Sequence, residues 1–120
     1  MQIEGYFNVR DEPVIGLDVG ASQIEFLVDT GFNGGLIIPE QMAERLDIKY
    51  DRGLEEFRTA NEATFLASAG SMEITWFGQA IRAPVATTEE VPEAILGGKM
   101  LKDCRLIIDY SERTVTIIAS

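Results

Sequence analysis

The sequence contains no histidine and only one cysteine, Cys104. Without histidine, Ser-His-Asp triads, Cys-His pairs and histidine-ligated metal sites are excluded. A single cysteine excludes an internal disulfide and a thiolate zinc cluster. Cys104 lies next to an apolar stretch, where a buried small side chain is favoured over a reactive thiol. If the chain is a hydrolase, carboxylates are therefore its natural catalytic groups.

Long apolar runs and basic runs are also missing. No apolar run approaches membrane-spanning length, and the N-terminus has no signal-peptide pattern. The chain has 10 Lys and Arg against 20 Asp and Glu, a formal net charge of -10, which disfavours binding to the phosphates of nucleic acids. We therefore expect a cytoplasmic protein with no nucleic-acid partner and no membrane partner.

The remaining composition fits one domain. The 120 residues are 46% hydrophobic, which is enough for a single core, so we expect residues 1–120 to form one domain. Short apolar segments at close spacing predict a mostly-β barrel or sandwich. A helix of about two turns is expected from Pro39 and a second helical piece at residues 99–102, whereas residues 50–53 have an irregular, polar pattern. The expected strands cover residues 2–9, 14–19, 24–28, 57–60, 64–67, 72–77, 81–85, 105–110 and 114–118.

Asp29-Thr30-Gly31 is the most informative stretch, and it directly follows the apolar residues 24–28. A carboxylate at the end of a core strand is costly unless it is stabilised or used. The triplet by itself is also typical of an ordinary strand-to-turn exit. In that interpretation Asp29 is a turn aspartate, Thr30 stabilises the turn through its hydroxyl, and Gly31 permits positive φ.

Two further features follow the triplet in a characteristic order. A hairpin with a polar tip comes at mid-chain, and Ile95-Leu96-Gly97 then leads into a short helix and a final pair of strands. This order resembles the retropepsin-like aspartic proteases, particularly their small single-domain prokaryotic relatives, over about residues 14–118. The resemblance implies the acid protease fold, a closed retropepsin-like β-barrel with one or two short helices and one lobe per chain.

The resemblance also implies a role for each residue of the triplet. Asp29 matches the catalytic aspartate. Thr30 matches the residue whose hydroxyl bonds the opposing loop across a subunit interface, and Gly31 matches the residue that lets the backbone approach the substrate. Residues 95–97 match a hydrophobic support beneath the catalytic loop. The implied function is an aspartic endopeptidase that acts on peptide or protein substrates and needs no metal and no cofactor.

The hairpin tip matches the flap that closes over bound peptide in this family. Phe32 stands where the viral enzymes usually have a small residue, so its ring would either fill a substrate subsite or crowd it. The polar tip also lacks the glycine-rich character of the viral flaps. The expected substrate-binding residues are Phe32, Thr59, Ala60, Asn61, Glu62 and Ala63.

The chain carries one such triplet, whereas the chemistry requires two carboxylates that share a proton. Asp18-Val19-Gly20 is the nearest internal candidate for a second copy. Val19 has no hydroxyl, and the segment falls at a hairpin turn, so we interpret it as turn chemistry. A single lobe therefore implies a homodimer with a two-fold symmetric site, to which each copy contributes Asp29.

Two other interpretations stay open. In the first, the chain is a catalytically weak or inactive protease-like module that binds peptide or mediates dimerisation. In the second, it is a structural β-barrel with no peptide cleft. The intact triplet favours the endopeptidase, because an inert descendant would be free to lose the acid.

Overall fold

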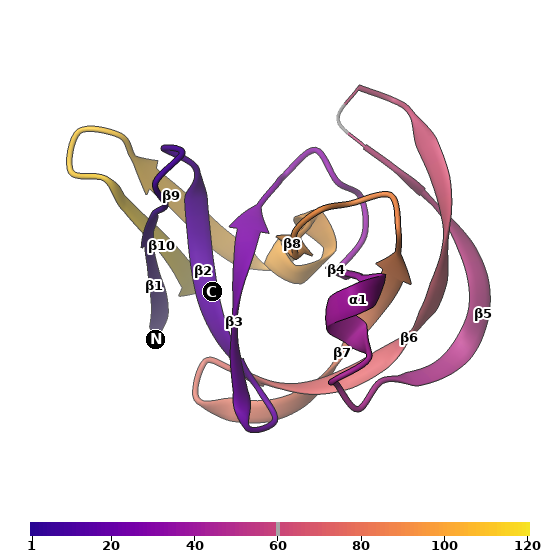
Figure 1. The fold of residues 1–120 in the computed structure, drawn as a ribbon. Helices are drawn as coiled ribbons and strands as arrows, with labels where there is room; N and C mark the ends of the chain where they lie inside the picture. Colours follow the sequence, from indigo (N-terminus) through magenta and orange to yellow (C-terminus); the bar gives the residue numbers. More distant parts are fainter. Residues whose placement is uncertain (60) are drawn as a thin grey trace.

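The computed structural model describes residues 1–59 and 61–120, which consist mostly of β-strands (Figure 1). The expectation of a mostly-β fold with one or two short helices is confirmed. No helix among these residues is long and apolar enough to cross a membrane. The elements are β1 Gln2–Phe7, β2 Pro13–Val19, β3 Ser22–Val28, β4 Leu36–Pro39, α1 Glu40–Ala43, β5 Lys49–Arg58, β6 Thr64–Trp76, β7 Gln79–Thr88, β8 Ile95–Leu96, the 3-10 helix η1 Gly98–Leu101, β9 Cys104–Asp109 and β10 Thr114–Ala119.

The ten strands form one curved sheet in the order β5-β6-β7-β4-β8-β3-β2-β1-β10-β9. The end strands β5 and β9 lie on opposite sides of the molecule in Figure 1 and are not paired with each other in the described part of the chain. The sheet is therefore open, and the closed barrel expected from the sequence is not confirmed. The physical reason is that the β5–β6 and β9–β10 hairpins extend away from each other, so no strand joins the two edges.

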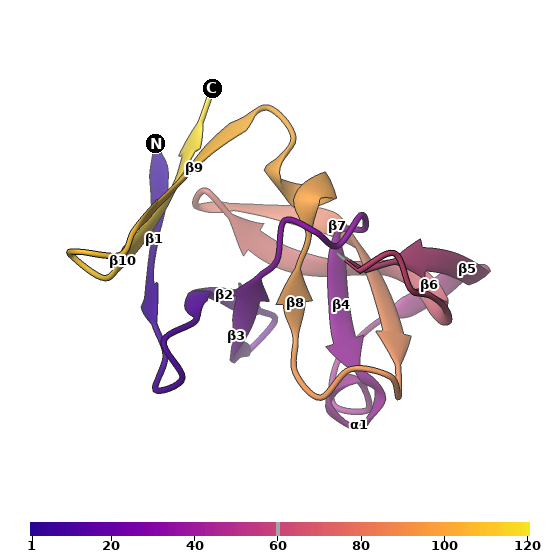
Figure 2. The same cartoon turned by 90° about the horizontal axis from the view of Figure 1, so that it is seen from above.

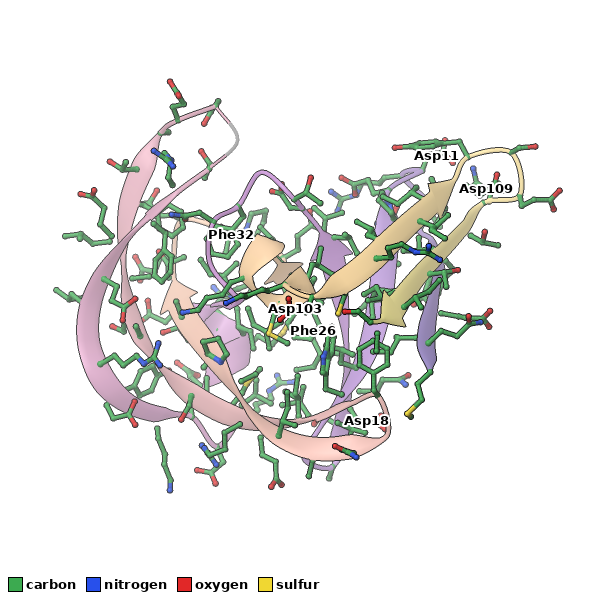
Figure 3. All side chains as sticks on the ribbon, turned by 180° about the vertical axis from the view of Figure 1, so that it is seen from behind. Asp11, Asp18, Phe26, Phe32, Asp103 and Asp109 are labelled. Atoms are coloured by element: carbon green, nitrogen blue, oxygen red, sulfur yellow. The ribbon has the colours of Figure 1, made fainter. Side chains whose placement is uncertain are left out.

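The predicted hairpin between β2 and β3 is confirmed, with Gly20 at φ +61° in its turn. Alternate residues of β3 face inward, so Ile24, Phe26 and Val28 are buried. Phe26 is fully buried, and its ring lies inside the molecule in Figure 3. Burial of a side chain of this size stabilises a fold by about 1.5–3 kcal/mol. The inward residues thereby hold β3, and the segment that follows Val28, at a fixed place on the core.

The short strand β8 lies between β3 and β4. It runs parallel to β3, with Val28 opposite Leu96, and antiparallel to β4, with Leu36 opposite Leu96. β4 in turn pairs in parallel with β7. Because β8 comes from far along the chain, this arrangement brings its last residue next to the end of β3 and the start of β4. Figure 2 shows these strands side by side.

The β5–β6 hairpin is longer than the sequence pattern predicts and curves outward from the sheet (Figures 1 and 2). The expectation that residues 50–53 are irregular is wrong, because β5 already begins at Lys49. The pairing register shifts between Lys49 and Gly53, and Gly53 adopts φ +68°. Such an irregularity interrupts the alternation of apolar and polar residues, which explains why the sequence shows no strand pattern there.

The helices are shorter than expected. Pro39 is the last residue of β4 and the N-cap of α1, not its first helical residue, and α1 forms one turn only. β4 pairs with β7 as far as Pro39, which lies opposite Thr88. This pairing keeps Pro39 extended, so the helix begins at the next residue. The second expected helical piece is the 3-10 helix η1.

A side-chain hydrogen bond joins β1 to β3 across the intervening β2. The Tyr6 hydroxyl donates to a carboxylate oxygen of Glu25, and both side chains are exposed. This bond raises the pKa of the Tyr6 phenol above 10.0, with smaller contributions from desolvation and from the charge of Glu25. The cause is that an ionised phenolate cannot donate the hydrogen bond and would face a like charge.

We expect Tyr6→Phe to lower stability in a pH-dependent way. Because the folded-state pKa of Tyr6 is raised, the stabilisation is fully present below pH 10.0 and is lost as the pH rises through that pKa. Urea unfolding should show a lower midpoint for Tyr6→Phe than for wild type near about pH 7, and the difference should shrink in alkali. Tyr110→Phe, at an exposed tyrosine in the turn after β9, is the control. A Tyr6→Phe effect that is independent of pH would contradict this assignment.

Candidate active site

The loop between β3 and β4, residues 29–35, begins with the Asp29-Thr30-Gly31 triplet directly after a core strand. The Asp29 amide donates to the Leu96 carbonyl at 3.0 Å, which continues the pairing of β3 with β8 by one residue. Asp29 is half-buried, whereas Thr30 and Gly31 are exposed. The loop therefore presents the acid and the two residues after it on its outer side.

The orientation of the Asp29 carboxylate is set within its own loop. Its Oδ1 atom accepts a hydrogen bond from the Gly31 amide at 3.0 Å, and its carbonyl accepts one from the Phe32 amide at 3.2 Å. Such a turn preorganises the carboxylate without a side-chain partner. A purely structural turn aspartate would make the same bonds, so this geometry fits both interpretations. Gly31 is not among the glycines with positive φ, so the turn does not require it for that reason.

The backbone beyond β8 supports the loop from beneath. The successive amides of Gly97, Gly98 and Lys99 donate to the carbonyls of Gly35 at 2.7 Å, Phe32 at 2.9 Å and Gly34 at 3.1 Å, respectively. These three bonds fix the loop along its length. The arrangement agrees with the packing role that the resemblance implies for residues 95–97.

The support leaves no room for side chains at two glycines. A Cβ atom on Gly97 would lie 2.8 Å from the Phe32 carbonyl oxygen and would also overlap the Phe32 ring and the Gly34 carbonyl. A Cβ atom on Gly34 would lie 2.6 Å from the Phe32 ring and 2.9 Å from the Phe57 ring. Gly97 has φ -98°, which any residue adopts, so space alone requires glycine there.

Phe32 lies beneath the β5–β6 hairpin, not on the outer side of the loop. It is 2% exposed, and its ring centroid lies 5.6 Å from that of Phe57 and 6.3 Å from that of Phe65. Figure 3 shows Phe32 near the hairpin side of the molecule and Asp18 at the opposite end. Asp18 is exposed on β2, beside the Gly20 turn, so the structure does not bring the second triplet to the Asp29 loop.

The predicted substrate residues of the hairpin tip lie together, apart from Ala60, which is outside the described residues. The Thr59 amide donates to the Ala63 carbonyl at 3.0 Å, and the Glu62 amide donates to the Thr59 carbonyl at 3.0 Å. The Asn61 carboxamide accepts from the Thr59 hydroxyl and from the Ala63 amide. Asn61, Glu62 and Ala63 are exposed, and Glu62 adopts φ +66°, which is unusual for a residue other than glycine or asparagine.

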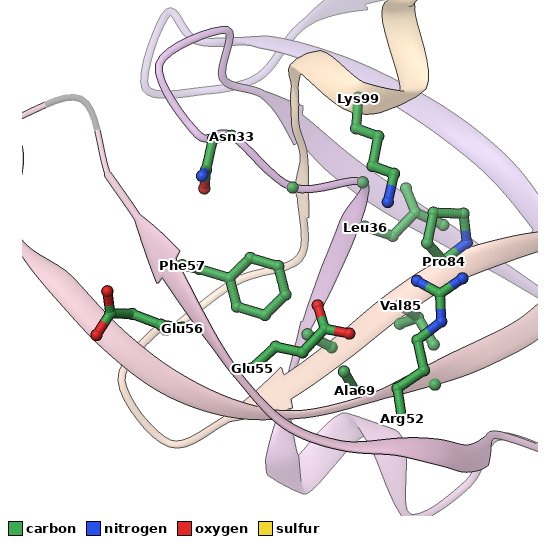
Figure 4. A pocket seen from close by; sticks show the side chains of 14 residues that line it. Asn33, Leu36, Arg52, Glu55, Glu56, Phe57, Ala69, Pro84, Val85 and Lys99 are labelled. Carbon is green, nitrogen blue, oxygen red and sulfur yellow. The ribbon is translucent and has the colours of Figure 1, made fainter.

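A pocket of about 180 Å³ lies beside the loop, between its residues 33–36 and strands β5 to β7 (Figure 4). Figure 4 shows the charged ends of Arg52, Glu55 and Lys99 directed toward this space. The sequence alone gives no signal for these residues, because the pairing of distant strands brings them together. Both signs of charge line the pocket, so it offers polar contacts beside the loop.

The chemistry available to the site is that of carboxylates. No group of three or more histidine, cysteine, aspartate or glutamate side chains within residues 1–59 and 61–120 is placed to hold a metal ion. In the described part of the chain, the side-chain hydrogen bond of Asp29 comes from its own loop. A half-buried, oriented carboxylate of this kind can accept or donate a proton. A shared proton requires a second carboxylate beside it.

Comparison with protein families identifies the family of the chain. The model of a family described as aspartyl protease matches residues 15–100, a range that contains the Asp29 loop, the β5–β6 hairpin and Gly97. A search of the curated proteins finds no match.

Comparison with solved structures shows the fold. The chain is similar to a retropepsin-like aspartic protease from Rickettsia conorii, with a TM-score of 0.68 and 18% identity over 99% of this chain and 91% of that one. It is also similar to the EIAV protease in complex with the inhibitor HBY-793, with a TM-score of 0.54 and 18% identity over 81% and 91% of the chains, respectively. A foamy viral protease-reverse transcriptase matches with a TM-score of 0.52 and 18% identity, over 85% of this chain and 11% of that chain. The fold is therefore retropepsin-like.

We expect Gly97→Ala to destabilise the protein by about 1–3 kcal/mol, because the added methyl group overpacks a site closed by backbone atoms. Gly16→Ala is the matched control, since a Cβ atom there makes only ordinary contacts with Gln23, the nearest at 3.7 Å. Urea unfolding of both variants checks the expectation. Equal stability of the two variants would contradict the expectation, because it would show that the loop shifts to make room for the methyl group.

Proposed function

Because the chain belongs to the aspartyl protease family, we propose that it is an aspartic endopeptidase that hydrolyses peptide bonds at a homodimer interface. In this proposal residues 1–120 form a single protease domain, and the catalytic group is a pair of Asp29 carboxylates, one from each copy. The observation that carries the proposal is the position of Asp29. It ends a core strand, is oriented by Gly31, and lies on a loop that Gly97 and its neighbours support.

The paired carboxylates divide the chemistry between them. Two carboxylates about 3 Å apart cannot both carry a charge, so they share one proton. The ionised carboxylate takes a proton from a water molecule as the water oxygen attacks the scissile carbonyl carbon. The protonated carboxylate donates a hydrogen bond to the carbonyl oxygen. The carboxyl group that took the proton from water then donates it to the nitrogen, so that the C–N bond breaks and the amine leaves, while the other carboxyl group keeps or regains its proton as the product carbonyl forms. No metal and no cofactor takes part.

A second copy of the chain supplies what one copy lacks. Asp18 lies away from the Asp29 loop, so it does not serve as the second acid. Thr30 is exposed beside Asp29, where its hydroxyl would bond the loop of a partner, and Gly31 is exposed beside it. A two-fold axis beside these loops would bring both copies of Asp29 together.

The substrate binds between the loop and the hairpin in this proposal. Residues 59–63 act as the flap over a bound peptide, with Asn61, Glu62 and Ala63 exposed, and Phe32 contributes by supporting the flap from beneath. The pocket beside residues 33–36 offers space for a substrate side chain with a polar end. The cytoplasmic location and the absence of nucleic-acid and membrane partners stay predictions.

We expect Asp29→Asn to lower kcat/KM by at least about 10²–10⁴-fold, because the amide cannot exchange the proton that the reaction moves. The measurement is cleavage of a diverse peptide library from acid to neutral pH. Asp18→Asn is the matched control, an aspartate in a similar triplet outside the site, and it should cleave as wild type does. Equal cleavage by wild type and Asp29→Asn would eliminate the dyad. No cleavage by any variant, with a folded dimer, would favour the peptide-binding or dimerisation module.

We also expect Asp29→Asn to inactivate wild-type chains by forming mixed dimers. When equal amounts are unfolded and refolded together, about a quarter of the dimers carry two wild-type chains, so activity per wild-type chain falls to about half. Wild type refolded with Asp18→Asn should keep its activity per active chain. An unchanged activity in the first mixture, or an active species at monomer mass in analytical ultracentrifugation, would defeat the shared site.

A further inference from the structure

We infer that Asn33 and Phe32 fasten the base of the β5–β6 hairpin to the loop that carries Asp29, so that hairpin base and loop move as one unit. We call the five residues that make this connection the latch: Asn33 and Phe32 on the loop, Phe57 and Arg58 on β5, and Phe65 on β6. For its catalytic consequence the inference rests on the proposed function, whereas the latch itself is a property of the fold.

The polar half of the latch is a reciprocal pair of hydrogen bonds. The Asn33 amide donates to the Arg58 carbonyl at 3.3 Å, and the Arg58 amide donates to the Asn33 Oδ1 atom at 2.9 Å. β5 is an edge strand of the sheet, so main-chain groups on its outer side have no strand to pair with. Asn33 satisfies two of these groups and acts as a one-residue extension of the sheet.

The apolar half of the latch is a cluster of three phenylalanine rings. Phe57 and Phe65 are directly opposite each other on the two strands of the hairpin, with centroids 5.9 Å apart. Phe32 packs against both from the loop and is 2% exposed. Aromatic contacts at these distances are favourable beyond the area they bury. The absence of space for a Cβ atom on Gly34 shows that the rings fill the gap between loop and hairpin.

The latch is connected to Asp29 through fixed backbone. Phe32 bonds the Asp29 carbonyl through its amide and accepts a hydrogen bond from Gly98 through its carbonyl. The Phe32 backbone therefore cannot shift without moving either the Asp29 turn or the support beneath it, and its ring is packed against Phe57 and Phe65. A displacement of the hairpin base is transmitted to the loop along this route.

The hairpin tip is held differently. The hydrogen bonds of Thr59, Asn61 and Ala63 stay within the tip. The latch thus sets a boundary at Arg58. The hairpin up to Arg58 stays with the loop, whereas the tip after it adjusts to a substrate. In the proposed enzyme, the tip can adapt to a bound peptide while the base keeps Asp29 in place.

The test compares Asn33→Leu, which removes the acceptor, with Asn33→Asp, which keeps an acceptor oxygen. Amide hydrogen exchange is measured for the full chain. In Asn33→Leu we expect exchange to rise roughly five- to tenfold at the amides of both the hairpin base and Gly31 and Phe32, with no change in the β2–β3 hairpin. Asn33→Asp should restore protection. Faster exchange in the hairpin alone, or a uniform rise everywhere, would overturn the latch.

A second pair of variants removes the apolar half and keeps the test decisive if Asn33→Leu does not fold. Phe57→Leu should loosen the same two segments, whereas Phe7→Leu, which changes a ring that packs against Tyr110, should not.

With peptide substrate, Asn33→Leu should lower kcat/KM roughly five- to tenfold and Asn33→Asp should recover it. If wild type cleaves no peptide, the proposed function fails while exchange still decides the latch. If wild type cleaves and Asn33→Leu cleaves equally well, the catalytic consequence is wrong.

Discussion

Three successive amides, those of Gly97, Gly98 and Lys99, donate hydrogen bonds to the loop that follows Asp29, and the geometry of the site depends on this contact. Loops usually satisfy their backbone groups with water, and they are mobile for that reason. Here another stretch of backbone satisfies them, each bond adding about 1 kcal/mol net and a larger penalty if it is broken while buried. Backbone can approach backbone so closely only without side chains, which is why glycines stand on both sides of the contact.

The supported loop separates an apolar side from a polar one. Phe32 faces inward and is buried against the rings of Phe57 and Phe65, while Asp29, Thr30 and Gly31 face outward. Burial of the ring therefore holds a carboxylate in a defined position without burying it fully, which limits the cost of its charge. The same division leaves Thr30 and Gly31 exposed on the outer side of the loop, and the Phe32 ring on the inner side connects the loop to the β5–β6 hairpin.

Much of the fold could be predicted from local pattern, and the errors have physical causes. Two apolar segments joined through Gly20-Ala21-Ser22 predict the β2–β3 hairpin, because a short connection with glycine lets the two segments pair. The first half of β5 was missed because a register shift at Gly53 removes that alternation. The closed barrel was expected by resemblance, but closure depends on where the two end strands lie, and no local pattern records that. Asp18-Val19-Gly20 lies at the predicted hairpin turn, where Gly20 adopts a positive φ, although Asp18 and Val19 still belong to β2.

The sequence by itself narrowed the chemistry: without histidine and with one cysteine, carboxylates are the natural catalytic groups of a hydrolase, and Asp29 directly follows an apolar strand and precedes Thr30-Gly31. Only the tertiary structure decided which way Phe32 points, that Asn33 pairs with Arg58, and that Gly97 has no room for a side chain. These contacts join segments far apart in the chain. Their distances are set by the order of strands in the sheet, which side-chain pattern within one segment does not specify.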